Sequence, residues 1–178
     1  HEAPTEAEQV IRLDPGLAFG TGTHPTTRMC LRWIARHAQP WPRVLDYGCG
    51  SGILAIGAAL HGARGIDAVD IDAAAVETTR ANALANAVTL AAGSPDRAHG
   101  HYALVLANIL AQPLTLLAPL LAAHVAPGGD LVLAGILERQ TDALQEAYAA
   151  WLTLVVQDRE DGWALMVGQR PATAAAAP

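Results

Sequence analysis

One short segment of the chain combines the residue types that a nucleotide-type cofactor site needs. An apolar strand beginning near Val44 ends in an acidic residue, Asp46, and an apolar helix follows from Ile53. The turn between them carries three alternating glycines, Gly48, Gly50 and Gly52. Eighteen residues after the last glycine, a second apolar strand ends in another acid, Asp70. This order is typical of the first turn of an alternating β/α domain that binds a nucleoside-type cofactor.

The glycine spacing distinguishes between two classes of cofactor. A dinucleotide site requires glycine or alanine at the sixth position of its fingerprint, which is Ile53 in this chain. The form D-x-G-x-G-x-G suits S-adenosylmethionine, which has no phosphate but must lie against bare backbone. Its methionine carboxylate can sit near the positive end of the helix that begins at Ser51. We therefore predict this cofactor, with S-adenosylhomocysteine as the product, and name as its binding residues Asp46, Gly48, Gly50, Gly52 and Asp70.

A simpler interpretation of these residues stays open. Turns between a strand and a helix often use glycine without binding anything. Asp70 or Asp72 could also cap the helix predicted over 73–86. We favour Asp72 as the cap because it lies nearer the start of that helix, which leaves Asp70 to accept hydrogen bonds from the ribose hydroxyls.

A second segment, from Leu13 to Thr27, is rich in glycine and proline and surrounds the only phenylalanine, Phe19. A loop with this much backbone freedom can close over a ligand, and we name Phe19 as a candidate active-site residue. The alternative is a flexible linker in which Thr26 caps the next helix and Phe19 packs against it. The residues alone do not decide between these two. We interpret His24 as a loop histidine and not as a catalytic base.

A third segment is an apolar strand that ends in the amide of Asn108. The carboxyl ends of parallel strands form the ligand crevice of an α/β sheet, so Asn108 would lie beside the donor methyl group. Its side-chain oxygen could accept a hydrogen bond from an incoming amine. The alternative role is a polar cap before the helix at 112–124. We favour the catalytic role.

Composition excludes several classes of protein. With 178 residues, 52% hydrophobic and 16% charged, the chain suits one globular domain. Its net charge is −6 and all 11 basic residues are arginine, so we expect a basic partner and no direct binding to nucleic acid. Cys30 and Cys49 are too few for a zinc site or a disulfide framework, and reduced thiols suggest a cytoplasmic protein. The most apolar stretch, 104–126, is interrupted by polar residues and prolines, which argues against a membrane span.

Helices and strands alternate along the chain. We predict helices over 26–37, 51–61, 73–86, 112–124 and 138–150, and strands over 43–46, 66–70, 88–92, 102–107, 130–135, 152–158 and 163–169. The segment Pro127-Gly128-Gly129 reads as a turn before the fifth strand. Short continuous apolar runs indicate parallel strands covered on both faces, and the tight turn at 160–162 indicates a final antiparallel hairpin. The prediction is an α/β, doubly wound, mostly parallel seven-stranded sheet, as in the class I methyltransferases.

Together the three segments resemble the ribosomal protein L-eleven methyltransferases, enzymes that methylate a protein of the large ribosomal subunit. The resemblance covers Leu13 to about Gln169, and its most specific part is the loop from Asp14 to Thr27. It implies cofactor binding by Thr27, Gly48, Asp70 and Asn108, with the Phe19 loop beside the site. Members of that family also carry an N-terminal domain that recognises the ribosomal protein. We accordingly predict a linker remnant at 1–12, a methyltransferase domain at 13–170 and a disordered tail at 171–178.

The predicted function is a protein N-methyltransferase that uses S-adenosylmethionine, or the catalytic domain of one. The resemblance implies lysine ε-amino groups and an N-terminal α-amino group of ribosomal protein L-eleven as the acceptors, and hence a basic, lysine-bearing partner. Two alternatives are a methyltransferase of another protein or small amine, and a cofactor-binding module with no activity of its own. If the docking domain is missing, we expect slow methylation of the ribosomal protein.

Overall fold

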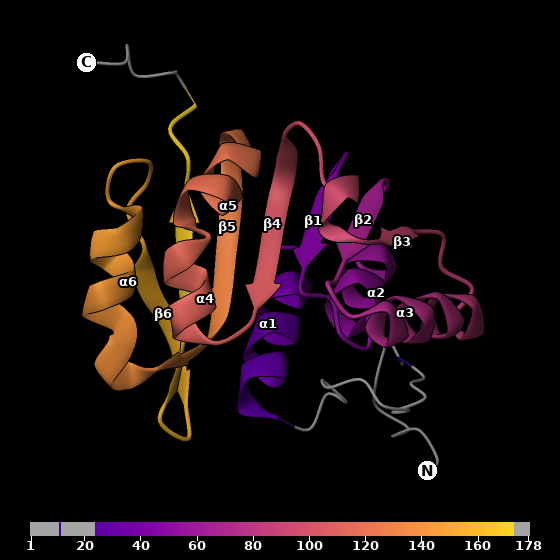
Figure 1. Ribbon diagram of the computed structural model, residues 1–178, viewed down its shortest axis with the longest axis horizontal. Helices are drawn as coiled ribbons and strands as arrows, with labels where there is room; N and C mark the ends of the chain where they lie inside the picture. The colour runs from indigo at the N-terminus through magenta and orange to yellow at the C-terminus, as the bar shows by residue number, and fades with distance from the viewer. Residues whose placement is uncertain (1–10, 12–23, 173–178) are drawn as a thin grey trace.

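The computed structural model describes residue 11 and residues 24–172. They form a seven-stranded sheet in the order β3-β2-β1-β4-β5-β7-β6 (Figure 1). The strands are β1 (Val44–Tyr47), β2 (Ile66–Val69), β3 (Ala91–Gly93), β4 (Tyr102–Asn108), β5 (Val125–Leu137), β6 (Val155–Glu160) and β7 (Trp163–Gln169). The α-helices are α1 (Pro25–Arg36), α2 (Ile53–Leu60), α3 (Ala73–Ala85), α4 (Ala111–Leu116), α5 (Ala118–His124) and α6 (Thr141–Tyr148). Two short 3-10 helices cover Pro95–Arg97 and Glu138–Gln140.

Strand direction confirms the predicted fold class. Strands β1 to β5 pair parallel with one another, whereas β7 pairs antiparallel with both β5 and β6. The turn between β6 and β7 places Asp161 and Gly162 at positive φ, 51° and 82°. Two successive residues at positive φ match the twist of a two-residue hairpin. The predicted terminal hairpin is therefore present at one edge of the sheet.

Helices cover both faces of the sheet, and the strand residues alternate between them. In β4, Leu104 and Leu106 pack in the cluster that contains buried residues of α1 and α2. Their neighbours Val105 and Ala107 pack in the other cluster, with residues of α4, α5 and α6. Because both faces are buried, the strand reads as a continuous apolar run and not as an alternating one.

The predicted helix at 112–124 is wrong in one respect, because the structure has two helices there. The first, α4, ends at Leu116, and the second, α5, begins at Ala118. Pro119 has no N–H to donate to the carbonyl four residues earlier, and its ring would clash with that carbonyl. The first turn of a new helix tolerates proline, and Pro119 lies there in α5.

Other predicted bounds also change, and the strand expected at 152–158 is β6 at Val155–Glu160. Strand β5 begins at Val125, which pairs with Tyr102, so the expected turn at 127–129 is a bulge within the strand. Residues 126–129 there lie opposite Ala103 alone, and Gly128 takes a φ of +79°. The strand expected at 88–92 forms only at its end and runs on to Gly93. The helix expected at 138–150 begins as a 3-10 turn and becomes α6 at Thr141.

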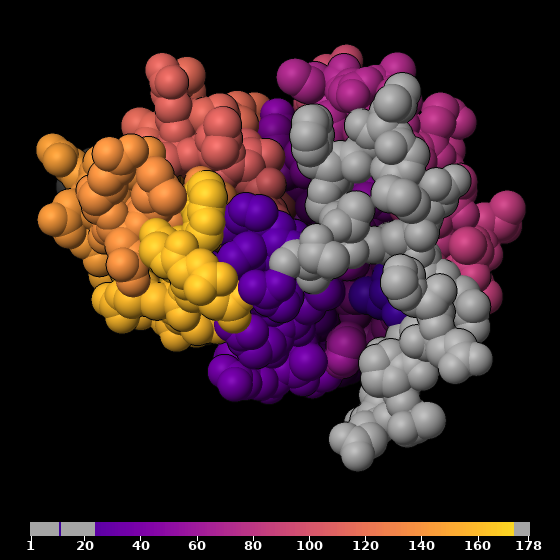
Figure 2. Space-filling view, turned by 90° about the horizontal axis from the view of Figure 1, so that it is seen from below, coloured from indigo at the N-terminus to yellow at the C-terminus, as the bar shows by residue number. Residues whose placement is uncertain are grey.

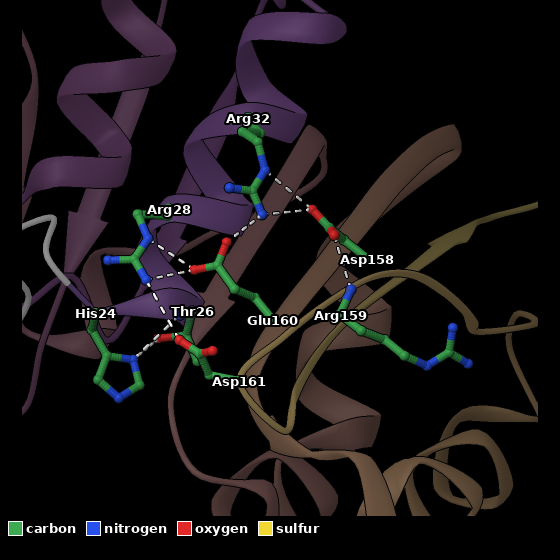
Figure 3. A network of polar contacts seen from close by, with 8 residues as sticks. All are labelled: His24, Thr26, Arg28, Arg32, Asp158, Arg159, Glu160 and Asp161. Atoms are coloured by element: carbon green, nitrogen blue, oxygen red, sulfur yellow. Dashed lines mark hydrogen bonds and ion pairs between the residues drawn. The ribbon is translucent and has the colours of Figure 1, made fainter.

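The edge hairpin is tied to α1 by a group of arginines and carboxylates (Figure 3). Arg28 donates to Glu160 at 2.8 Å, and Arg32 bridges Glu160 and Asp158 at 2.9 and 3.1 Å. Hydrogen bonds from Arg28 and then Arg32 lower the pKa of Glu160. The helix and the hairpin also meet where the ring of His24, just before α1, lies 5.1 Å from the ring of Trp163 in β7. The hairpin therefore supports the N-terminus of α1, where the site begins.

In the described part of the chain, no helix has the length and apolar character needed to cross a membrane. The predicted linker remnant lies outside the described residues except for Ile11, which packs against the α1–α2 side of the core. The predicted tail is described only at Pro171 and Ala172.

Candidate functional site

A cavity of about 750 Å³ lies at the carboxyl ends of β1, β2 and β4. Figure 2 views the molecule from this end, where the start of α1 (indigo) lies beside the tip of the β6–β7 hairpin (yellow). Predicted site residues that line the cavity are Thr27, Asp46, Gly48, Gly50, Asp70 and Asn108. The three segments singled out in the sequence thus contribute residues to one cavity, although Phe19 lies outside the described residues.

The turn after β1 has glycine at three positions where the backbone is left-handed. Gly48, Gly50 and Gly52 have φ values of +79°, +54° and +84°, which side chains disfavour. The N–H groups of Gly48 and Cys49 both donate to the carbonyl of Val69, at 2.8 and 2.9 Å. The turn is thereby held against the end of β2.

Gly52 differs from the other two glycines in its surroundings. It is absent from the described cavity lining, and a Cβ there would approach the Thr79 side chain of α3 to 2.8 Å. The structure therefore gives Gly52 a packing role between the turn and α3. Its appearance in the cofactor pattern reflects the shape of the turn.

Asp70 joins the turn to the second strand end. Its Oδ2 accepts the N–H of Gly50 at 3.0 Å, and its Oδ1 accepts the N–H of Asp72 at 2.9 Å. An ionised carboxylate has about four acceptor positions, so two remain for a ligand. Asp72 accepts the N–H of Ala74 at 2.9 Å and is the N-cap of α3, as predicted.

Asp46 is the most buried acid of the site, with 1% of its surface exposed. Its Oδ2 accepts the N–H of Ala55, in the first turn of α2, at 3.1 Å. Burial raises the pKa of Asp46 to about 7; the Ala55 N–H opposes this rise and the charge of Asp70 adds to it. Asp46 can therefore change its protonation state near neutral pH.

Asn108 is the last residue of β4, and its amide nitrogen lies 3.4 Å from Thr27 Oγ1. Thr27, on α1, is buried, and it holds the amide so that Asn108 Oδ1 remains an acceptor. The alternative role of Asn108 as a helix cap is wrong, because the N-cap of α4 is Leu110. The contact joins two residues that are 81 positions apart in the sequence.

The segment after Asn108 passes between two glycines. A Cβ on Gly48 would lie 2.6 Å from the side chain of Ile109, and a Cβ on Gly135 would collide with the Ile109 carbonyl. Gly135 lies in β5 with a φ of +89°, where the pairing of β5 with β7 shifts register. Sequence analysis missed Gly135, for which the only local signal was a glycine inside an apolar strand.

Comparison with known proteins agrees with this arrangement. Residues 1–171 match the family model described as "Ribosomal protein L11 methyltransferase (PrmA)". The chain belongs to this family. It is 70% identical over 169 residues to the ribosomal protein L11 methyltransferase of Polaromonas sp., covering 93% of this chain and 57% of that protein. The Dechloromonas aromatica protein of the same name is 52% identical over 172 residues, covering 96% of this chain and 58% of its own length.

A solved structure shares the fold as well as the sequence. The crystal structure of a ribosomal protein L11 methylase from Lactobacillus delbrueckii subsp. bulgaricus superposes with a TM-score of 0.85 at 32% identity. The match covers 96% of this chain and 90% of that one. The chain spans little more than half the length of the curated relatives that it matches.

Two further residues of this L11 methyltransferase family member have roles that the sequence did not reveal. His24 is the N-cap of α1: its Nδ1 accepts the backbone N–H of Thr26 at 3.2 Å and lies 2.8 Å from Thr26 Oγ1. The alternative with Thr26 as the cap is therefore wrong. Because Nδ1 accepts the backbone N–H, the neutral ring carries its proton on Nε2 and offers no free base there.

Ile71 forms an apolar wall of the cavity, directly after Asp70, although 90% of its surface is exposed. A flat aromatic ring placed there would cover this side chain. No sequence signal marked Ile71 for this position, because a single isoleucine between two acids belongs to no motif.

We expect Gly135→Ala to destabilise the protein more than Gly162→Ala. Both positions have positive φ, but a Cβ at Gly162 meets nothing within 4 Å, whereas one at Gly135 meets the Ile109 backbone. Gly162→Ala is the control, and it should lose stability only because of its positive φ. The overpacking at Gly135 should increase the loss by about 1–3 kcal/mol. Urea unfolding of the two variants measures the difference. Equal losses would show that the Ile109 backbone moves aside freely.

We expect the stability of Asp46→Asn, relative to the parent, to increase with pH. The pKa of Asp46 is raised in the folded state, so the folded protein keeps a proton that the unfolded chain releases between about pH 4 and about pH 7. Parent stability therefore falls as pH rises through this window, by up to about 1.4 kcal/mol per pH unit. The asparagine amide can still accept the Ala55 N–H, and it does not titrate in this window. Urea unfolding across the window, with Asp142→Asn on α6 as the control, tests this; a pH-independent difference would contradict it.

Proposed function

We propose that this chain transfers methyl groups from S-adenosylmethionine to amino groups of ribosomal protein L11, namely lysine ε-amines and the N-terminal α-amine. The observation that carries the proposal is the single cavity in which the glycine turn, Asp70 and the Thr27–Asn108 pair meet. Methyl transfer is assigned to residues 13–170.

The charge of the cavity supports this cofactor over a dinucleotide. Three carboxylic acids line it, Asp46, Asp70 and Asp72, and none of its described lining residues is an arginine. A pyrophosphate would be repelled there by the acids and would lack the cationic side chains that usually hold it. A ligand that carries a sulfonium cation and no phosphate suits this lining. Its ribose hydroxyls can donate to the two acceptor positions left on Asp70.

The adenine ring also has a suitable surface. Ile71, Pro95 and Leu110 are among the described residues of the cavity wall. The cavity volume of about 750 Å³ lies within the range of small-molecule sites. Bare backbone at Gly48 and Gly50 leaves room for the methionine part.

The bound cofactor supplies a methyl group already activated by its sulfonium. The chain's own contribution is to orient the acceptor amine and to exclude water. Asn108 Oδ1 accepts a hydrogen bond from the amine, and Thr27 keeps the amide in that orientation. The Nδ1 atom of His24 is occupied by the backbone N–H of Thr26, and the amine must be free of its extra proton before it can attack. Asn108 would hold the amine nitrogen so that its lone pair faces the methyl group that the cofactor supplies.

The acceptor is inferred from the family and from charge. The matching relatives are called ribosomal protein L11 methyltransferases. A net charge of −6 without lysine suits a basic, lysine-bearing partner, and methylation of a ribosomal protein would take place in the cytoplasm.

We expect Asp70→Ala to weaken binding of S-adenosylmethionine by about tenfold or more, because hydrogen bonds to a charged group contribute about 1.5–3 kcal/mol. Isothermal titration calorimetry measures the affinity, with Asp142→Ala on α6 as a matched loss of an acid far from the cavity. Unchanged affinity in Asp70→Ala, or tight binding of NAD by the parent, would contradict the cofactor assignment.

We expect Asn108→Ala to slow methyl transfer by about tenfold to a hundredfold, because the amine loses an orienting contact. Cofactor affinity and the thermal midpoint should change much less. Mass spectrometry of purified L11 after timed incubation measures the rate, and Thr27→Val should slow it by a smaller factor. A full rate in Asn108→Ala would remove its catalytic role, and cofactor binding by the parent without any methyl transfer would favour a binding module.

A further inference from the structure

We propose that the buried carboxyl group of Asp46 is linked through its proton to the charge of the bound cofactor. It releases a proton when the cationic methyl donor enters the cavity, and it regains one when the neutral product remains after transfer. This inference rests on the proposed function and adds a residue that senses whether the methyl group is still on sulfur.

The position of Asp46 makes it the inner wall of the site. It lies near the end of β1, lines the cavity, and is almost fully buried. In the sheet it is paired with Leu106 of β4, two residues before Asn108. Strand spacing places the Cα atoms of Asp46 and Asn108 about 8 Å apart. A sulfonium whose methyl group faces Asn108 therefore lies within the range of strong electrostatic interaction with Asp46.

No cation offsets the Asp46 carboxyl group in the described structure. It forms no ion pair there, and its recorded polar partner is the N–H of Ala55. The acid facing it from the end of β2 is Asp70, whose negative charge disfavours a second one. The thiols of Cys30 on α1 and Cys49 in the turn also feel its charge, and burial keeps the pKa of both well above neutral. Helix α2 contains no titratable residue.

These surroundings leave Asp46 balanced between its two protonation states. Burial, the largest effect, raises the pKa to about 7 despite the favourable N–H of Ala55. A unit positive charge about 8 Å away, at an effective dielectric constant of about 20, changes proton affinity by roughly thirtyfold. That is enough to convert a largely protonated carboxyl group into a largely ionised one near neutral pH.

The protons balance over one turnover. Binding of the sulfonium converts the carboxylic acid to a carboxylate and releases one proton to solvent. Methyl transfer removes the positive charge from sulfur, so the carboxylate becomes an uncompensated buried charge and takes up one proton. The consequence is preferential binding of the donor over the product as pH rises, since only the donor attracts the carboxylate.

A purely structural role for Asp46 makes a different prediction. If the carboxyl group serves only to bind the Ala55 N–H, an amide oxygen replaces it fully. Donor and product would then release the same number of protons on binding, and Asp46→Asn would not change the binding of either ligand.

The test is calorimetric titration of the parent with S-adenosylmethionine and with S-adenosylhomocysteine, each in two buffers of different ionisation enthalpy. We expect more protons to be released with the donor than with the product near pH 7. We also expect the ratio of donor to product affinity to rise between about pH 5 and about pH 8, by at most about thirtyfold in total, because that is the limit set by the charge interaction. In Asp46→Asn the pH dependence of binding should fall to the part that comes from the ligands' own amino groups. Those groups titrate alike with the parent and with the variant.

A second measurement covers the possibility that Asp46→Asn does not fold. Carbon-13 NMR of aspartate carboxyl groups in the parent follows the titration of Asp46 directly, and the donor should lower its pKa more than the product does. Equal proton release, or equal pKa values with both ligands, would overturn the inference and leave the proposed function standing. Failure of both ligands to bind would instead overturn the proposed function.

Discussion

The carbonyl of Val69 accepts the N–H groups of both Gly48 and Cys49, and the rest of the site depends on this pair of hydrogen bonds. They hold the turn after β1 against the end of β2, which brings Gly50 within reach of Asp70. The turn can make these bonds only because its glycines accept positive φ. A side chain at Gly48 would also displace Ile109, so the same backbone geometry places the segment after β4. One local conformation thus sets the relative positions of three strand ends.

The separation of charges decides what the cavity can hold. Arg28 and Arg32 pair with the acids of the β6–β7 hairpin, and Arg43 lies over the ring of Tyr102 and near Asp67. No arginine is left among the described cavity residues, whereas three acids remain there. The acid side chains of the cavity repel an anionic group and attract a cationic one. The effect of the basic residues on the cavity therefore depends on where the arginines lie in the fold.

Elements far from the cavity keep its catalytic side in position. The hairpin at the sheet edge holds α1 through Glu160 and Asp158, and α1 carries Thr27 to Asn108. On the other side, the absence of a side chain at Gly135 lets β5 approach the Ile109 backbone. The role proposed for Asn108 requires this support from both sides, because a small displacement lowers the rate of a reaction that depends on positioning.

Features that depend on local backbone preference can be predicted from the residues of a short segment. The alternating glycines indicated a turn at positive φ, Asp72 was placed correctly as a helix cap, and the apolar runs indicated a sheet covered on both faces. Each of these is encoded within a few residues, by φ preference, by a side chain that reaches its own backbone, or by burial pattern. The acid at the end of β2 and the amide at the end of β4 followed from the rule that parallel strand ends meet.

Which of those residues line the cavity, and in what protonation state, depends on how elements far apart in the chain pack together. Gly52 has the same spacing signal as Gly48, yet α3 packs against it and the cavity does not reach it. The contact of Thr27 with Asn108 and that of Gly135 with Ile109 join segments far apart in the chain, so no local pattern encodes them. The raised pKa of Asp46 arises from burial under other elements and from the charge of Asp70. Local sequence sets backbone shape, whereas proximity, desolvation and charge exist only after the elements have packed together.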